Sequence, residues 1–184
     1  MPDVCLSGGC VGADLAFGAA AKKAGHEVVH WGFGGMASKT GEDVRVLSHE
    51  KLVKADPYLM AANEILNRTY PSRFIYTNNL LRRNYYQIAK SDSVYAVTTL
   101  LGDGKVAGGT GWAVAMAILK GIDVIYVYEQ EKEQWFRHDG DKKNLWGWHE
   151  MYQPFKPRGI YTGIGTSKLN EAGEKAIKEL YNGQ

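Results

Sequence analysis

Hydrophobic and polar positions follow two alternating patterns along the chain, which predicts strands separated by helices. Short apolar runs typical of buried strands occur at 4–6, 26–31, 93–97, 122–128 and 160–162. Apolar residues recur at helical spacing in 13–24, 41–54, 57–68, 78–89, 112–120 and 169–180. Strands that alternate with helices favour a parallel sheet with helices on both faces. We therefore expect a three-layer α/β fold over residues 1–184 as a single domain.

Two glycine-rich turns stand where a predicted strand gives way to a helix. The candidate ligand-binding residues of the first turn are Ser7, Gly8, Gly9, Cys10, Gly12 and Asp14. Those of the second turn are Gly108, Gly109, Thr110, Gly111 and Trp112. Glycine lets the backbone approach a ligand closely, and the N–H groups at a helix N-terminus attract anions. We predict that both turns face one crevice and hold a phosphate group. The glycines within 163–167 predict a third glycine turn.

Further candidate ligand-binding residues lie outside the turns. Trp31 and Phe33 stand at the end of the second predicted strand, in a segment where loops commonly contact ligand. Arg83 is expected to pair with phosphate beside Asn84, whereas Arg82 is expected to face solvent. Two roles stay open for Trp112, which can stack on a base or pack between helix and sheet. Asp14 is a helix-dipole partner or, alternatively, a ribose-binding or catalytic acid.

Charge and cysteine content restrict the partners. The 184 residues, 45% of them hydrophobic, carry 22 Lys and Arg against 20 Asp and Glu, a formal net charge of +2. A net charge this small lacks the basic field of a nucleic-acid binder. No apolar stretch has membrane-spanning length. The two cysteines, Cys5 and Cys10, are expected to be reduced, which favours the cytoplasm. His26 and His30 would lie about 13 Å apart on a strand, so we expect no metal, and no cofactor.

Aromatic residues crowd the segment 130–158, where the pattern assigns no regular structure. They include Trp135, Trp146, Trp148, Tyr152 and Phe155. We interpret this segment as an insertion that forms satellite core or a subunit contact, or a lid over the ligand. Aromatic side chains left exposed there would favour a homo-oligomer.

Three segments together resemble the SLOG superfamily, a Rossmann-like group that includes the lonely guy phosphoribohydrolases and nucleotide-sensing domains. They are 7–14, the helical Arg83-Asn84-Tyr85, and Gly108 to Gly111 at the start of a helix. The resemblance covers most of residues 4–128 and implies a nucleotide or nucleotide-sugar phosphate as ligand. In the phosphoribohydrolases the last motif continues to a catalytic glutamate, and Ala115 stands at that place here.

That departure separates binding from catalysis. Cleavage of an N-glycosidic bond needs a carboxylate near the sugar, which Ala115 does not supply. The chain therefore resembles the binding members of the superfamily, which implies that it senses or sequesters a nucleotide signal, such as an ADP-ribose variant or a cyclic nucleotide, without turnover. The alternative is an N-glycosidase or transferase acting on nucleoside monophosphates, in which Asp14, Asp43 or Glu42 supplies the carboxylate. DNA binding, the third possibility within the superfamily, fits the near-neutral charge poorly.

Overall fold

One eight-stranded sheet organises the molecule in the computed structural model, which describes residues 1–36 and 43–182. In the order of the sheet, its strands are β3 (Val44–Leu47), β2 (Glu27–Phe33), β1 (Val4–Ser7), β8 (Ile160–Gly165), β4 (Ser93–Thr98), β5 (Val124–Glu129), β6 (Gln134–His138) and β7 (Trp148–Met151). The first six in this order are parallel to their neighbours, and β6 and β7 pair antiparallel. The sheet is therefore mostly parallel, as expected for an α/β fold.

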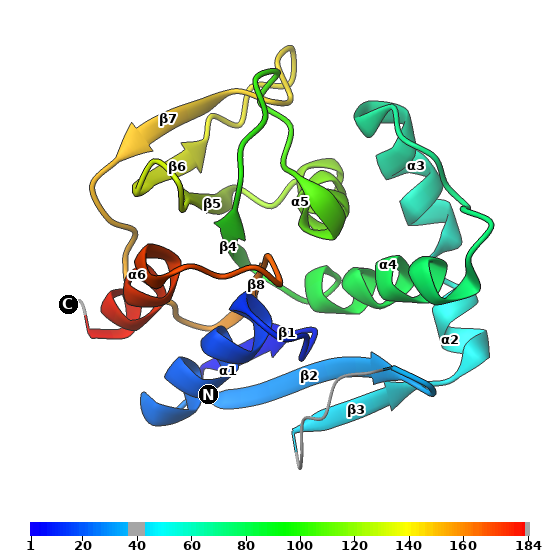
Figure 1. Cartoon of the computed structure of the whole chain (residues 1–184), viewed down its shortest axis with the longest axis horizontal. Helices are drawn as coiled ribbons and strands as arrows, with labels where there is room; N and C mark the ends of the chain where they lie inside the picture. Colours follow the sequence, from blue (N-terminus) through cyan, green and yellow to red (C-terminus); the bar gives the residue numbers. More distant parts are fainter. Residues whose placement is uncertain (37–42, 183–184) are drawn as a thin grey trace.

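Helices cover both faces of this sheet (Figure 1). They are α1 (Ala13–Lys23), α2 (His49–Val53), α3 (Asp56–Leu66), α4 (Ile75–Ile88), α5 (Gly108–Lys120) and α6 (Glu171–Asn182). Side chains of β4 alternate between the two layers, since Val94 and Ala96 join the core under α3, α4 and α5, whereas Tyr95 and Val97 join the core under α1 and α6. The predicted α/β architecture with helices on both faces is thus confirmed.

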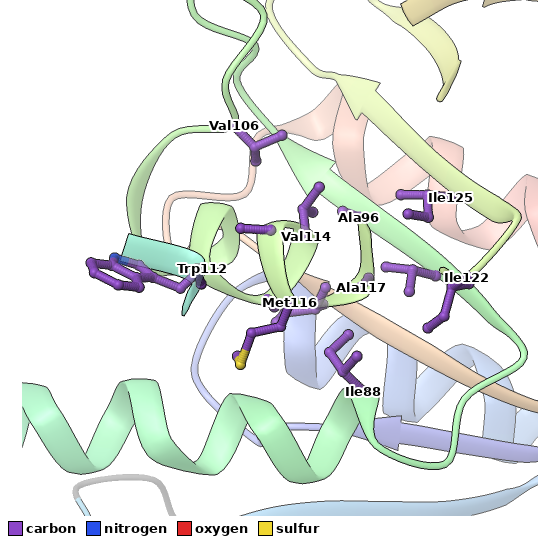
Figure 2. Close-up of a cluster of buried hydrophobic side chains, with 14 of the residues drawn as sticks. Ile88, Ala96, Val106, Trp112, Val114, Met116, Ala117, Ile122 and Ile125 are labelled. Carbon is purple, nitrogen blue, oxygen red and sulfur yellow. The ribbon is translucent and has the colours of Figure 1, made fainter. Parts of the chain in front are cut away.

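The core beneath α5 is built from aliphatic side chains of α5, β4 and β5 (Figure 2). Val114, Ala96 and Ile125 are fully buried there, and Ile88 of α4 is 1% exposed. Small residues along α5 let the helix approach the sheet closely. This packing fixes the position of the N-terminus of α5, where the second glycine turn lies.

Two of the predicted elements are wrong. Where the structure describes the helix expected over 41–54, from residue 43 on, the chain forms a strand, β3, followed by the five-residue helix α2, and 41–42 lie outside the described residues. Val44-Arg45-Val46-Leu47 is an edge strand that pairs parallel with β2. The glycine turn expected at 163–167 is strand as far as Gly165. Its glycines serve close packing, since a Cβ on Gly163 would lie 2.6 Å from Phe17 and one on Gly165 would lie 2.1 Å from the Val97 carbonyl oxygen.

The aromatic segment 130–158 continues the sheet. Its strands β6 and β7 extend the sheet beyond β5, and Trp135 is buried against Tyr128 with ring centroids 5.1 Å apart. Tyr152 and Phe155 remain 96% and 79% exposed. Of the helices in the described ranges, none is long and apolar enough to cross a membrane.

The order of the parallel strands places a topological switch in the middle of the sheet. From β1 the chain continues outward through β2 and β3, and from β4 it continues outward in the other direction through β5. β8 lies between β1 and β4 and pairs with both. In open α/β sheets, ligands bind at the carboxyl ends of the strands where the strand order reverses.

Candidate functional site

A cavity of about 360 Å³ lies at this switch, at the carboxyl ends of β1, β8 and β4. Its size falls within the range of ligand pockets in proteins. Five segments contribute its lining, which consists of Cys10, Asp14, Leu80, Leu81, Arg83, Asn84, Thr98, Thr99, Ala107, Gly108, Gly109, Thr110, Ile164, Gly165, Thr166 and Ser167. Residues of both predicted glycine turns are among them. The expectation that the two turns face one cavity is therefore confirmed.

The second turn presents the open N-terminus of α5 to the cavity. Gly108 and Gly109 are exposed, and Thr110 is 6% exposed. The Gly111 N–H donates to the Ala107 carbonyl oxygen at 3.3 Å, but the N–H groups of Gly108, Gly109 and Thr110 have no acceptor among the described residues. Thr98 and Thr99 add hydroxyl groups at the end of β4. This wall of the cavity offers hydrogen-bond donors and the positive end of a helix dipole.

The first turn contributes a buried ion pair. Asp14 is 3% exposed and Arg83 is 5% exposed, with 3.7 Å between Asp14 Oδ2 and Arg83 Nη1. Asp14 also accepts hydrogen bonds from the N–H groups of Cys10, at 3.4 Å, and Gly165, at 3.2 Å. Burial raises the pKa of Asp14, although Arg83 and these hydrogen bonds oppose that shift. The carboxyl group therefore binds a proton more readily than an exposed aspartate does.

The guanidinium of Arg83 has unused donors. Nη2 donates to Cys10 Sγ at 2.9 Å and Nη1 to the Trp31 carbonyl oxygen at 3.5 Å, while the buried Nε has no partner among the described residues. Burial raises the pKa of the Cys10 thiol, which opposes thiolate formation. A buried arginine with an unpaired donor is costly unless an acceptor reaches it. Because Arg83 lines the cavity, its positive charge favours an anionic ligand there.

Several predicted ligand residues lie behind the cavity wall. Ser7 donates through Oγ to the Asp14 carbonyl oxygen, and Gly8 and Gly9 are buried beside it. Gly12 is the N-cap of α1 and packs against Thr166 and Ser167. These glycines and Gly111 support the turns without lining the cavity.

The three aromatic residues that were predicted to contact ligand pack on other aromatic rings outside the cavity. Trp31 packs on Tyr86 at 5.6 Å between ring centroids, and Phe33 packs on Tyr76 at the same distance. Trp112 is 5% exposed and packs on Tyr70 on the side of α5 turned away from β4 (Figure 2), which corresponds to the packing role of the two left open for it. None of the three lines the cavity.

Other charged candidates also lie elsewhere. Arg82 was expected to face solvent, but it is buried, and its Nε donates to Asp56 at 2.7 Å. Asp43 pairs with Lys22 at 2.9 Å outside the cavity, and Glu42 lies outside the described residues. Ala115 is fully buried in the core and does not line the cavity. Asp14 is thus the one proposed carboxylate that the described structure brings to the cavity.

Sequence reasoning missed the apolar and hydroxyl-bearing lining residues. Leu80 precedes Arg83 by three residues and Leu81 precedes Asn84 by three, so the side of α4 that carries Arg83 and Asn84 indicates them. Thr98 and Thr99 follow a buried strand, which is the general signal for a switch-point site. The position of Thr166 and Ser167 depends on β8 pairing between β1 and β4, which no local pattern indicates.

Among residues 1–36 and 43–182, no group of three or more histidine, cysteine, aspartate or glutamate side chains is placed to hold a metal ion. Cys5 and Cys10 are both free. Comparisons of the chain with family models, curated proteins and solved structures found no match.

Proposed function

We propose that the chain binds a phosphorylated nucleoside derivative in the switch-point cavity, as nucleotide-binding members of the SLOG superfamily with their Rossmann-like sheets do. One observation carries the proposal: the buried Arg83 guanidinium, with its unpaired Nε, lines the same cavity as the free N–H groups at the start of α5. Both features favour an anion, and arginine is well suited to phosphate. Leu80, Leu81 and Ile164 supply an apolar wall against which a base or sugar can pack.

The first experiment identifies a retained ligand. Protein purified without added nucleotide is denatured by heat, and the released small molecules are analysed by mass spectrometry. A phosphorylated nucleoside derivative at near-stoichiometric amount supports the proposal. Calorimetric titration with nucleoside monophosphates, cyclic nucleotides and ADP-ribose then measures affinity. If none of these compounds binds and no ligand is released, the proposal is wrong.

Thr110→Val tests where the phosphate binds. The change removes a hydroxyl that has no hydrogen-bond partner among the described residues, so it leaves no donor unpaired. We expect an affinity loss of about tenfold, since a hydrogen bond to a charged group contributes roughly 1.5–3 kcal/mol. Thr77→Val on the exposed side of α4 is the matched control and should bind normally. Equal affinity of both variants for nucleotide would place the phosphate elsewhere.

A catalytic role is the second candidate, and the protonation behaviour of Asp14 favours it. A buried carboxyl with a raised pKa beside an arginine is suited to acid–base chemistry. We nonetheless propose binding without turnover, because both Asp14 oxygens are already held by backbone N–H groups. Chromatography of nucleotides incubated with the protein should detect no released base. Base release that is abolished by Asp14→Asn would establish the enzyme instead.

We propose, in addition, that the protein is cytoplasmic and forms a homo-oligomer. Its two free cysteines support the first statement and the exposed Tyr152 and Phe155 support the second. Sedimentation of the wild type and of a Phe155→Ser variant tests the second statement. A wild type that sediments as a monomer would remove it.

A further inference from the structure

Arg68, in the connection between α3 and α4, binds the backbone of the second glycine turn. Its Nη1 donates to the Gly108 carbonyl oxygen at 2.9 Å, and its Nη2 donates to the Val106 carbonyl oxygen at 2.6 Å. One planar guanidinium therefore joins both sides of the turn. Arg68 does not itself line the cavity. It acts on the turn from outside.

A second side chain holds the next carbonyl. Asn84 Nδ2 donates to the Gly109 carbonyl oxygen at 3.1 Å, and Asn84 Oδ1 accepts from Gln87 Nε2 at 3.1 Å. Because a trans peptide is planar, fixing the carbonyls of Gly108 and Gly109 also fixes the directions of the N–H groups of Gly109 and Thr110. The donors at the start of α5 are thus oriented before any ligand arrives.

The close approach of the Val106 carbonyl oxygen, which Arg68 binds, explains why residue 111 is glycine. A Cβ on Gly111 would lie 2.1 Å from the Val106 carbonyl oxygen and 2.8 Å from Arg68 Nη1. Any side chain there would displace either the guanidinium or the turn. The glycine therefore permits the close packing of the turn that Arg68 holds.

The charge of Arg68 lies at the positive end of a helix. Cations near a helix N-terminus are unfavourable, and no acidic residue occupies the first turn of α5. Among the residues that the structure describes, Arg68 forms no ion pair, and the charge of Asp103, which pairs with Lys105, acts on it only without direct contact. Burial lowers the pKa of Arg68, as expected for a cation that lacks a close counter-charge. The local field thus favours an anion on the cavity side of the turn.

We propose that Arg68 is a positioning residue of the phosphate site: it presets the donors of Gly109 and Thr110 and adds positive charge behind them. This inference rests on the proposed function. It identifies the group bound at the start of α5 as the phosphoryl group, with the nucleoside toward Leu80 and Leu81. The contribution of Arg68 is therefore specific to the phosphate and absent for the nucleoside alone.

The test compares three variants by calorimetry with two probes. The probes are the tightest binder among AMP, GMP, CMP and UMP, and the nucleoside that corresponds to it. Arg68→Met should weaken nucleotide binding by about tenfold or more and leave nucleoside binding unchanged, since hydrogen bonding and charge at the turn are lost. Arg68→Lys keeps the charge but cannot span both carbonyls, so its loss should be intermediate. Arg73→Met, an exposed arginine of the same connection, is the control and should bind as wild type.

The outcomes separate this inference from the proposed function. If the wild type binds no nucleotide, the proposed function fails and the inference fails with it. If the wild type binds nucleotide and Arg68→Met binds it equally well, only the inference is overturned. Equal losses for nucleotide and nucleoside would show a general structural role and would also overturn it. If Arg68→Met does not fold, the nucleotide-to-nucleoside ratio of Arg68→Lys decides in the same way.

Discussion

The two glycine turns share a sequence pattern but differ in whether the N–H groups at the start of the following helix already have hydrogen-bond acceptors. At the first turn, the Ala13 N–H donates to the Thr166 carbonyl oxygen at 2.9 Å, and Asp14 accepts two further backbone N–H groups. At the second turn, Gly108 to Thr110 keep N–H groups without an acceptor among the described residues. An acidic residue lies in the first turn of α1 and none lies in the first turn of α5. A glycine pattern thus predicts a helix start, and the residues just after it indicate whether that start is open to an anion.

Arg83→Met gives the largest expected effect and tests whether the first turn is closed by an internal ion pair. The change leaves Asp14 buried without its cation, which should lower the free energy of unfolding by about 3 kcal/mol. This is the lower end of the usual range, because Asp14 readily takes up a proton. Urea denaturation monitored by circular dichroism measures the loss. The double variant Arg83→Met, Asp14→Asn should recover part of it, and a single variant as stable as wild type would contradict the closed-turn interpretation.

A pair of glycine substitutions in the second turn gives an intermediate effect. Gly111→Ala should destabilise the fold by roughly 1–3 kcal/mol, because its Cβ would meet the Val106 carbonyl oxygen. Gly109→Ala is the matched control, since its Cβ would meet only Leu81 Cδ2, at 4.0 Å. Thermal unfolding of both proteins measures the difference. Equal melting temperatures would mean that the turn yields easily and that its donors are not preset.

The smallest expected effect is the contribution of Asp14 to the pH dependence of the free energy of unfolding. Its pKa is raised by burial above 3.8, the ordinary value for an aspartate, so the unfolded chain releases this proton at lower pH than the folded chain does. The contribution of Asp14 is therefore present below about pH 3.8 and is lost as pH rises through the folded-state pKa. Relative to Asp14→Asn, the wild type should lose stability over this range in urea titrations at successive pH values. A wild type that gains stability relative to the variant would mean that Arg83 outweighs burial.

Hydrophobic periodicity correctly predicted the elements in which one face, or every side chain, is buried over many residues. The helix predicted at 78–89 corresponds to α4, and the strand predicted at 93–97 corresponds to β4. β3 was mistaken for helix because four residues beside another helix carry too little periodic signal. The antiparallel strands β6 and β7 were not predicted, since their aromatic and charged residues fit no single pattern.

The cavity was predicted in position but only partly in composition. The glycine turns led to Asp14 and Gly108 and the helix pattern of 78–89 led to Arg83, and all three line the cavity. The direction of Trp112 depends on α3 packing beside α5, and that contact joins residues distant in sequence. The role of Arg68 could not be predicted for a related reason. Its partners are backbone carbonyls about 40 residues away, which have no signature in the sequence.

The central place of β8 has a consequence for the order in which the molecule assembles during synthesis. β1 with β2 and β3, and β4 with β5, β6 and β7, form two strand groups that are joined in the sheet only through β8. A ribosome delivers β8 after all the other strands, so the two half-sheets must wait for residues 160–165 before they join. Such long-range pairing slows folding and leaves the half-sheet edges exposed until it occurs. The cavity, whose walls come from both halves, is therefore a late product of translation.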